Sequence, residues 1–258
     1  MAETRRIRLI IEYDGTNYAG WQRQENALAV QQVMEDKWAR LTGEKLVMTG
    51  SSRTDAGVHA LCQNIHFDTA SRIPPEKISF ALNTMLPDDI RVRASMAAPE
   101  DFHARFGATG KVYRYQIYNA RHASAMGRLT SAHVPLPLDV ERMQREANAL
   151  IGTQDFAAFA AAGSIVRDTV RTMYDVKVKR DGDWVAIYVH GNGFLYNMVR
   201  ILAGTLIEVG TGKREEGAIA RAVESHSRLD LGLTAPAKGL TLMEVFYGND
   251  EDARKYFL

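Results

Sequence analysis

Residues 171–191 read RTMYDVKVKRDGDWVAIYVHG, and this stretch decides the architecture of the second half of the chain. The ranges Arg171 to Lys179 and Trp184 to Gly191 are rich in β-branched and aromatic residues, which predicts two strands. Asp181-Gly182 lies between them, and this dipeptide is typical of the tight turn of a β-hairpin. The stretch therefore predicts two adjacent antiparallel strands.

The elements around this hairpin follow a similar order in both halves of the chain. The first half predicts a strand at 6–12, ended by Asp14-Gly15, and a helix at 30–41, ended by Gly43. Two short strands at 45–49 and 63–68, a helix after Pro74-Pro75 and a last strand at 90–96 follow. After Phe106 the pattern predicts a strand at 111–118, an amphipathic helix at 138–151 and the hairpin at 171–191. A long apolar helix at 194–209, a shorter helix at 215–225 and a last strand at 239–247 follow.

This repeated order predicts the fold class. Sequence identity between the halves is negligible, so the prediction of a duplication rests on element order alone. We expect an α+β protein whose two similar, ferredoxin-like halves cover residues 1–105 and 106–258. The halves would form one large, mostly antiparallel sheet with helices packed on it and an active-site cleft between them.

Composition and charge exclude several classes of protein. The chain has 258 residues with 46% hydrophobic and 24% charged residues, enough to bury a full core. Thirty-two basic residues face 31 acidic ones, so the chain is not a polycation that binds nucleic acid by composition. The single cysteine cannot form an internal disulfide, and neither a signal segment nor an apolar run of membrane-spanning length is present. We expect a soluble, cytoplasmic protein with no membrane partner.

The stretch GSSRTDAGVHA at residues 50–60 is the strongest candidate for a site. It lies between two predicted strands, and its small residues allow close approach of a ligand. Asp55 has two interpretations: a residue that caps its own turn, or a catalytic carboxylate kept ionised by the neighbouring Arg53.

Two further segments carry residues suited to RNA or to catalysis. Segment 101–130 interleaves aromatic and basic residues around KVYRY (111–115), as in proteins that stack unpaired bases and bind phosphates; the alternative is a strand with packed tyrosines and solvated cations. The apolar helix that follows Gly193 contains Arg200, whose guanidinium needs a carboxylate partner if it is buried. Asp55 is our candidate partner, and Arg200 reaching a carbonyl or the surface is the alternative.

Two other motifs suggest ligands less directly. His59, Cys62 and His66 have near ligand spacing for zinc, but no further ligand pair accompanies them. The glycine-rich segment 14–24 lacks phosphate-loop spacing. It is either an ordered turn or a loop that contacts RNA through Gln22, Arg23 and Gln24.

Taken together, these motifs resemble the tRNA pseudouridine synthase A family. The resemblance rests on EYDGTNYAGWQRQ (12–24), SRTDAGVHA (52–60), DFHARF (101–106), KVYRYQIYN (111–119) and FLYNMVRILAG (194–204), which cover most segments of the chain. It implies conversion of uridine to pseudouridine at positions 38, 39 and 40 of the tRNA anticodon stem-loop, by a homodimer without cofactor or metal. It also implies the duplicated α+β fold.

The resemblance also assigns roles to residues. Asp55 corresponds to the catalytic aspartate and Tyr113 to a tyrosine that lies against the target base. Arg53 corresponds to an RNA contact involved in exposing that base, and Arg200 to the arginine that pairs with the aspartate. Ser52 stands where many members carry glycine, so it must fit an allowed φ. Whether Asp55 adds to C1′ of the ribose or removes the 2′ proton to give a glycal stays open.

Two other functions compete with this one. An RNA glycosidase would break the same N1–C1′ bond, but such enzymes usually use a paired acid and base, and one carboxylate alone has a site-like setting here. A non-catalytic RNA-binding module of duplicated ferredoxin-like halves would use Asp55 only as a turn former.

Overall fold

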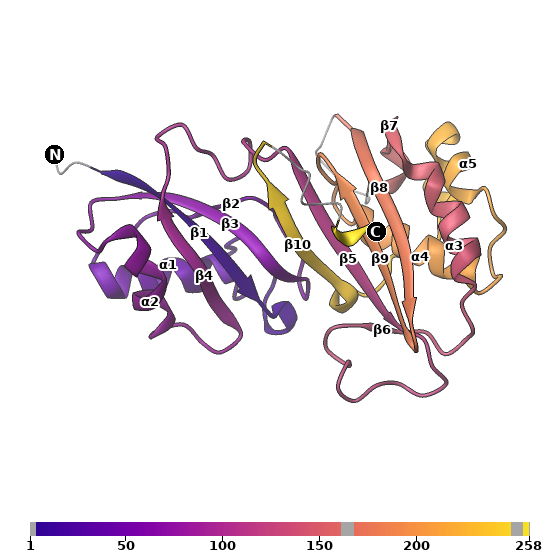
Figure 1. Ribbon diagram of the computed structural model, residues 1–258, viewed down its shortest axis with the longest axis horizontal. Helices are drawn as coiled ribbons and strands as arrows, with labels where there is room; N and C mark the ends of the chain where they lie inside the picture. Colours follow the sequence, from indigo (N-terminus) through magenta and orange to yellow (C-terminus); the bar gives the residue numbers. More distant parts are fainter. Residues whose placement is uncertain (1–3, 161–167, 249–254, 258) are drawn as a thin grey trace. The chain divides into compact units, whose positions relative to one another are not determined.

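The computed structural model describes residues 4–160, 168–248 and 255–257, and the chain divides into two compact units (Figure 1). Unit 1 comprises residues 1–109 and 242–248, and unit 2 comprises residues 110–241 and 249–258. Both units combine helices with mainly antiparallel strands, so the predicted α+β class is confirmed.

Unit 1 is a sheet covered by two helices. Its strands and helices are β1 (Arg5–Tyr13), α1 (Val30–Thr42), β2 (Thr49–Gly50), β3 (His59–Thr69), α2 (Ile78–Asn83), β4 (Ile90–Ala97) and β10 (Leu240–Phe246), the last of which begins in unit 2. β1 runs antiparallel to both β3 and β4, and β10 lies beside β3. Ile7 and Leu9 face Phe67 and Ile65 across the ladder, and the Trp38 ring of α1 lies 4.9 Å from that of Phe67. Alternation along β1 therefore directs its apolar face to the helices.

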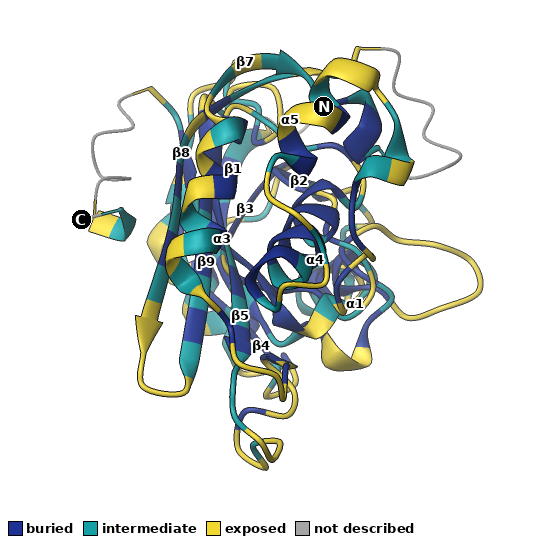
Figure 2. Ribbon diagram, turned by 90° about the vertical axis from the view of Figure 1, so that its right-hand side faces the viewer, coloured by how far each residue is buried: buried dark blue, intermediate teal, exposed yellow. Residues whose placement is uncertain are grey.

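Unit 2 has the same kind of construction. Its elements are β5 (Gly110–Tyr118), β6 (Ala132–His133), α3 (Val140–Ala147), β7 (Gly152–Asp155), β8 (Val170–Asp181), β9 (Trp184–Gly191), α4 (Met198–Gly210) and α5 (Ala218–Ser225). The strands run in the order β5, β9, β8, β7 with antiparallel pairing, and β6 pairs parallel to β5. Gln144 of α3 bonds the backbone of β8 at Val176 and Val178, and α4 is buried along most of its length (Figure 2).

Most predicted elements are confirmed, and two differ for identifiable reasons. Residues 45–48 do not form the predicted strand, because the Met48 N–H donates to the Glu35 carboxylate and its C=O accepts from Gln31 of α1. The helix predicted from Phe194 begins only at Met198, because Asn197 has φ +62°, outside the helical region. Strands β6 and β7 were not predicted.

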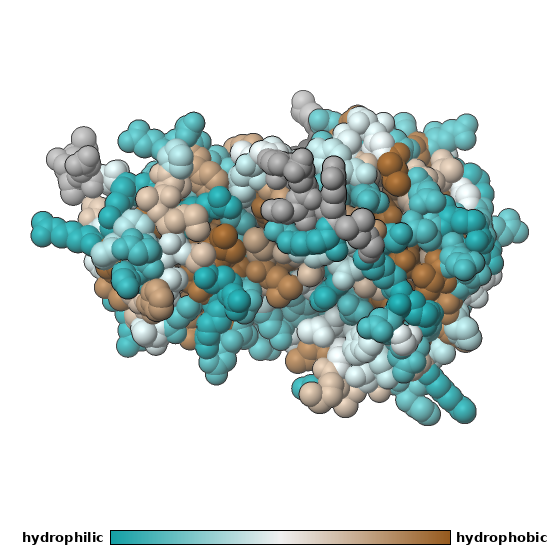
Figure 3. Space-filling view, in the orientation of Figure 1, coloured by the Kyte–Doolittle hydropathy of each residue, from teal (hydrophilic) through white to brown (hydrophobic). Residues whose placement is uncertain are grey.

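The face of the protein that Figure 3 shows is mixed in hydropathy. In the view of Figure 3, apolar side chains lie in small groups separated by polar ones. Within the described residues, no helix is both long enough and apolar enough to cross a bilayer.

Candidate functional site

The loop that carries Asp55 connects β2 to β3 and is fixed at its base by one buried amide. The Gln63 side chain is fully buried; its Oε1 accepts from Ser51 Oγ (2.7 Å) and the Ser52 N–H (3.1 Å), and its Nε2 donates to the Ser52 C=O (2.6 Å). The Ser51 N–H also donates to the Asn64 C=O at 2.8 Å. Because these groups are bound inside the protein, the polypeptide leaving β2 has a defined direction up to Arg53 and Asp55.

The glycine-rich segment 14–24 supports the same loop from the other side. The Trp21 N–H donates to the Thr54 C=O at 3.1 Å, and the Gly57 N–H donates to the Tyr18 C=O at 3.2 Å. Tyr18 and Trp21 are 6% and 2% exposed, so they are packed against the protein rather than presented to a partner. The Tyr13 hydroxyl and Thr54 Oγ1 lie 2.7 Å apart in a buried hydrogen bond.

The polar side chains of this segment are also engaged internally. Arg23 pairs with Glu35 at 3.0 Å, Gln22 donates to the Gln31 side chain at 3.0 Å, and Gln24 donates to the Ala19 C=O at 2.8 Å. These bonds show an ordered turn, which holds the Asp55 loop through the backbone contacts of Tyr18 and Trp21. Gln22, Arg23 and Gln24 are also exposed, so their contact with RNA stays a prediction.

Gly20 shows how tight this packing is. Its φ is +87°, and a Cβ at this position would overlap the Thr54 carbonyl oxygen. Gly43 is a matched control, since its φ is +80° but no heavy atom of the described chain lies within 4 Å of its added Cβ.

We expect Gly20→Ala to lower the free energy of unfolding by about 2–5 kcal/mol, the sum of backbone strain and overpacking. Gly43→Ala should cost only the strain, about 1–2 kcal/mol. Urea unfolding of both variants measures the difference, and equal losses would mean that segment 14–24 does not press on the Asp55 loop.

Ser52 fits its position without backbone strain. Among the described residues only Asn197 and His226 are non-glycine residues with positive φ, so Ser52 adopts an ordinary conformation. Its side chain is 5% exposed, and its Oγ has no hydrogen-bond partner in the described part of the chain. The serine is therefore accommodated, at the cost of one buried hydroxyl without a partner.

The histidines with zinc-like spacing bind neighbouring protein groups instead. His59 Nδ1 lies 3.1 Å from the Gly15 N–H and 3.0 Å from the Asp14 carboxylate, and His66 Nδ1 accepts from the Ala104 N–H at 3.1 Å. Across residues 4–160, 168–248 and 255–257, no group of three or more His, Cys, Asp or Glu side chains could hold a metal ion. These contacts give His59 and His66 a structural role that accounts for their positions in the sequence.

Tyr113 lies on β5 in unit 2, with its side chain 8% exposed. Its ring contacts that of Phe194 edge-to-face, with centroids 5.0 Å apart and an angle of 82° between the planes. Phe194 precedes α4, so its position depends on the same turn that delays the start of that helix. This contact gives the Tyr113 ring a defined orientation.

Arg200 projects from the first turn of α4 and binds nearby polar groups. Its Nε donates to the Ala235 C=O at 2.9 Å, and its Nη1 donates to Asn197 Oδ1 at 2.7 Å. Glu208, the other charged residue of this helix, pairs with Arg214 at 2.9 Å. These two bonds hold the Arg200 side chain at the start of α4, and its pairing with Asp55 stays a prediction. The arginine partner that the structure gives to Glu208 is Arg214.

The predicted site residues are divided between the two units. Arg53 and Asp55 share one loop of unit 1, whereas Tyr113 and Arg200 belong to unit 2. The residues that hold the Asp55 loop and the Tyr113 ring were not predicted from the sequence, namely Gln63, Tyr18, Trp21 and Phe194. The glycine pattern of segment 14–24 was the available signal, because glycine is needed where two backbone segments touch.

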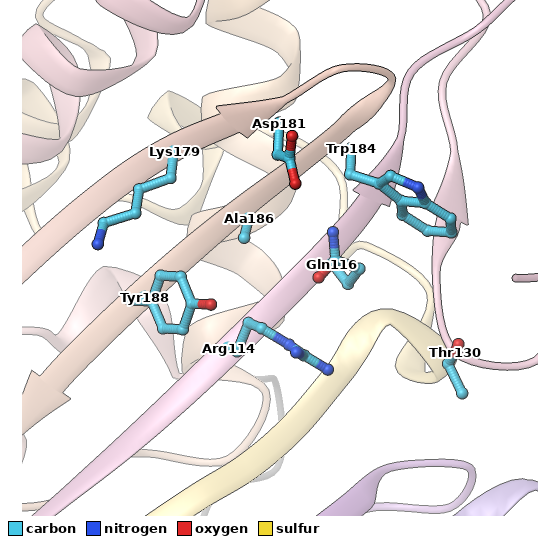
Figure 4. A pocket seen from close by; sticks show the side chains of 8 residues that line it. All are labelled: Arg114, Gln116, Thr130, Lys179, Asp181, Trp184, Ala186 and Tyr188. Atoms are coloured by element: carbon cyan, nitrogen blue, oxygen red, sulfur yellow. The ribbon is translucent and has the colours of Figure 1, made fainter. Parts of the chain in front are cut away.

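In the strand KVYRY, the two tyrosines and Arg114 lie on opposite faces. Tyr115 is fully buried on the helix side with Tyr113, and its hydroxyl donates to the Pro236 C=O at 2.8 Å; burial raises the pKa of Tyr115. Arg114 points to the opposite face, because side chains alternate along a strand. There a pocket of about 400 Å³ is lined by Arg114, Gln116, Thr130, Lys179, Asp181, Trp184, Ala186 and Tyr188 (Figure 4). None of the four predicted site residues lines it.

Comparisons with known proteins agree with this set of motifs. A family model described as tRNA pseudouridine synthase matches residues 9–107 and 147–248. Proteins called tRNA pseudouridine synthase A are similar over 94% of this chain and 100% of their own lengths: one from Ruminiclostridium cellulolyticum is 53% identical, one from Acetivibrio thermocellus 52% and one from Geotalea uraniireducens 49%.

Proposed function

Because this chain belongs to the tRNA pseudouridine synthase family, an isomerase family, we propose that it acts on uridines 38, 39 and 40 of the tRNA anticodon stem-loop. Membership in a family of enzymes also disfavours the non-catalytic RNA-binding module. The observation that carries the proposal is the RTDAG loop, in which Asp55 is presented by backbone that Gln63 and segment 14–24 hold from two sides.

The chemistry requires few groups. The N1–C1′ bond of uridine breaks, the uracil turns, and C5 bonds to C1′. The C5 proton leaves and N1 takes up a proton, so substrate and product contain the same atoms. We propose that Asp55 either adds to C1′ or removes the 2′ proton to form a glycal. No net oxidation occurs, so the reaction needs no redox cofactor, and we propose that it proceeds without cofactor or metal.

The other three residues receive roles around this carboxylate. We propose that the Tyr113 ring lies against the uracil, with its hydroxyl or a nearby water accepting the C5 proton. Arg53 would contact the RNA where the base is exposed, because a stem uridine must leave the helix at a cost of a few kcal/mol. Arg200 would supply the positive charge that keeps Asp55 ionised. In this proposal the N-terminal half, residues 1–105, carries the Asp loop, and residues 106–258 carry the Tyr strand and the Arg helix.

We further propose a cytoplasmic homodimer. A single subunit of this length has a radius of gyration of about 18 Å, which offers limited surface to a long L-shaped tRNA. Two-fold symmetric dimers are the commonest oligomers, and a second subunit would extend the binding surface. The single cysteine suits a reducing compartment.

The experiment that tests the proposed substrate is position mapping. The protein is incubated with unmodified tRNA transcripts that carry uridine at position 38, 39 or 40, and pseudouridine is located by reverse transcription after carbodiimide treatment. We expect stops at these positions and none in a transcript with cytidine at all three. Stops confined to other arms of the tRNA would contradict the proposal.

Binding of tRNA should weaken steeply with salt although the net charge is only +1. Arg105, Arg121 and Arg128 are exposed, and each phosphate that they neutralise releases bound counterions. We expect the dissociation constant to rise by about tenfold or more between 50 and 200 mM salt. Filter binding at several salt concentrations measures this, and an unchanged affinity would show that phosphate contacts contribute little.

A further inference from the structure

Unit 1 presents a second cationic segment next to the Asp55 loop. In the sequence DFHARF (101–106), Arg105 is exposed and the Phe106 side chain is 77% exposed. The Arg105 guanidinium lies 5.5 Å from the centre of the Phe106 ring. The centroids of the His103 and Phe106 rings are 4.4 Å apart. The tip of this segment therefore presents an exposed apolar ring with a cation beside it.

The segment is firmly anchored, so the exposure of its tip is a defined feature. His103 Nδ1 accepts hydrogen bonds from the backbone N–H groups of Arg105 (3.1 Å) and Phe106 (3.0 Å). The Ala104 N–H donates to His66 Nδ1 at 3.1 Å, and burial lowers the pKa of His66 to about 4. His66 is therefore neutral at physiological pH, as an acceptor of this bond must be.

Tyr247 connects this segment to the Asp55 loop. Its hydroxyl donates to the Ala104 C=O at 2.7 Å and lies close to the Ser51 side chain. Ala104 precedes Arg105 directly, and Ser51 lies two residues before Arg53. Burial and the positive charge of Arg53 both lower the pKa of Arg105, which agrees with the proximity of the two guanidiniums.

The guanidiniums of Arg53 and Arg105 differ from other arginines of the protein in their counter-charge. Within the described part of the chain, neither Arg53 nor Arg105 forms an ion pair with a carboxylate, whereas Arg6, Arg23 and Arg214 each do. Two like charges held close together repel each other, and an anion between them relieves that repulsion. Guanidiniums bind phosphate oxygens with paired hydrogen bonds, and unpaired bases stack on exposed aromatic rings.

We propose that Arg53, Arg105 and Phe106 form one RNA-binding surface, in which the two guanidiniums bind a backbone phosphate and the Phe106 ring stacks on an unpaired base. This inference rests on the proposed function, since it concerns the RNA next to the target uridine. The partner is single-stranded or locally opened RNA, because a base inside a helix has no free face for the ring.

Two exposed residues of the same unit provide matched controls. Arg40 on α1 is exposed, and Phe80 on α2 is 69% exposed with the Lys77 ammonium 5.4 Å from its ring centre. The variants Arg105→Gln and Phe106→Ser are compared with Arg40→Gln and Phe80→Ser. Thermal unfolding of each protein verifies that all four remain folded.

We expect Arg105→Gln and Phe106→Ser each to weaken binding of an anticodon stem-loop RNA by about tenfold, and both controls to bind as wild type does. The salt dependence should fall by about 0.7–0.9 in log–log slope for Arg105→Gln and stay unchanged for Phe106→Ser. The double variant of Arg53 and Arg105 should lose less than the two single losses combined, because both arginines hold one phosphate.

A neutral methylphosphonate linkage, placed in turn at each phosphate around the target uridine, tests the phosphate directly. At one position, the neutral linkage should weaken binding of the RNA to the wild-type protein. The same linkage should not weaken binding to the Arg105→Gln variant any further. If Arg105→Gln and Phe106→Ser bind like their controls while wild type still forms pseudouridine, this inference is wrong and the proposed function stands. If wild type forms no pseudouridine, the proposed function fails, and the binding series still reports on the surface.

Discussion

Asp55→Asn should lower the rate of pseudouridine formation by about 10³-fold or more while binding of tRNA stays near that of wild type. Asparagine is nearly isosteric, so the loop held by Gln63 and segment 14–24 should keep its conformation. What disappears is the carboxylate that attacks C1′ or accepts the 2′ proton. Single-turnover assays with excess protein measure the chemical step, and filter binding measures affinity.

Asp14→Asn is a suitable control for this variant. Asp14 is also a turn aspartate in unit 1; its side chain accepts from Thr16, and these hydrogen bonds, together with the charge of His59, lower its pKa despite partial burial. If aspartate acts only as a turn former, the two variants should lose activity to a similar extent. Pseudouridine formation by Asp55→Asn at anything near the wild-type rate would remove Asp55 from the mechanism.

Arg200→Met should lower activity by about 100-fold, more than its loss of stability accounts for. Methionine keeps most of the side-chain volume but removes the charge proposed to hold Asp55 ionised. It also removes the donors to the Ala235 C=O and to Asn197, so we expect a loss of about 1–3 kcal/mol in the free energy of unfolding. The acid limb of the pH–rate profile should move to higher pH, because a carboxylate without its counter-charge takes up a proton more readily.

Arg214→Met distinguishes this role from a structural one. Arg214 also binds a carboxylate and carbonyl groups of unit 2, namely Glu208, Asp230 and Leu231. The Arg214→Met variant should be less stable than wild type, and the acid limb of its pH–rate profile should not move. A shift of the acid limb in Arg214→Met, or an unchanged profile with full activity in Arg200→Met, would show that Arg200 does not act on Asp55.

Local signals in the sequence predicted most of the fold because their causes are local. Asp181-Gly182 forms the expected hairpin turn with Gly182 at φ +55°, and Gly43 ends α1 at φ +80°. Prediction failed where side chains far along the chain decide the backbone. Residues 45–49 contain the strand-forming residues Val47 and Thr49, yet Gln31 and Glu35 of α1 bind the backbone of Met48. No pattern within residues 45–48 contains that information.

The same distinction applies to the candidate site. The loop around Asp55 was identified because a charged pair among small residues is visible in one short string. The groups that hold it come from three separate segments: Gln63 lies on β3, Trp21 in the glycine-rich segment and Tyr247 at the end of β10. Only the three-dimensional structure brings these segments together, so their role could not be assigned from spacing.

The fate of the uracil in a single reaction tests the central claim most directly. The substrate is a tRNA transcript whose uridines carry tritium at C5 and carbon-14 in the ring. Isomerisation at Asp55 predicts one tritium released to water for each pseudouridine formed, with all carbon-14 retained in the RNA, and neither change with Asp55→Asn. Release of carbon-14 as free uracil by the wild-type protein would contradict the account, since it would show that the glycosidic bond is cleaved and the base is not rejoined.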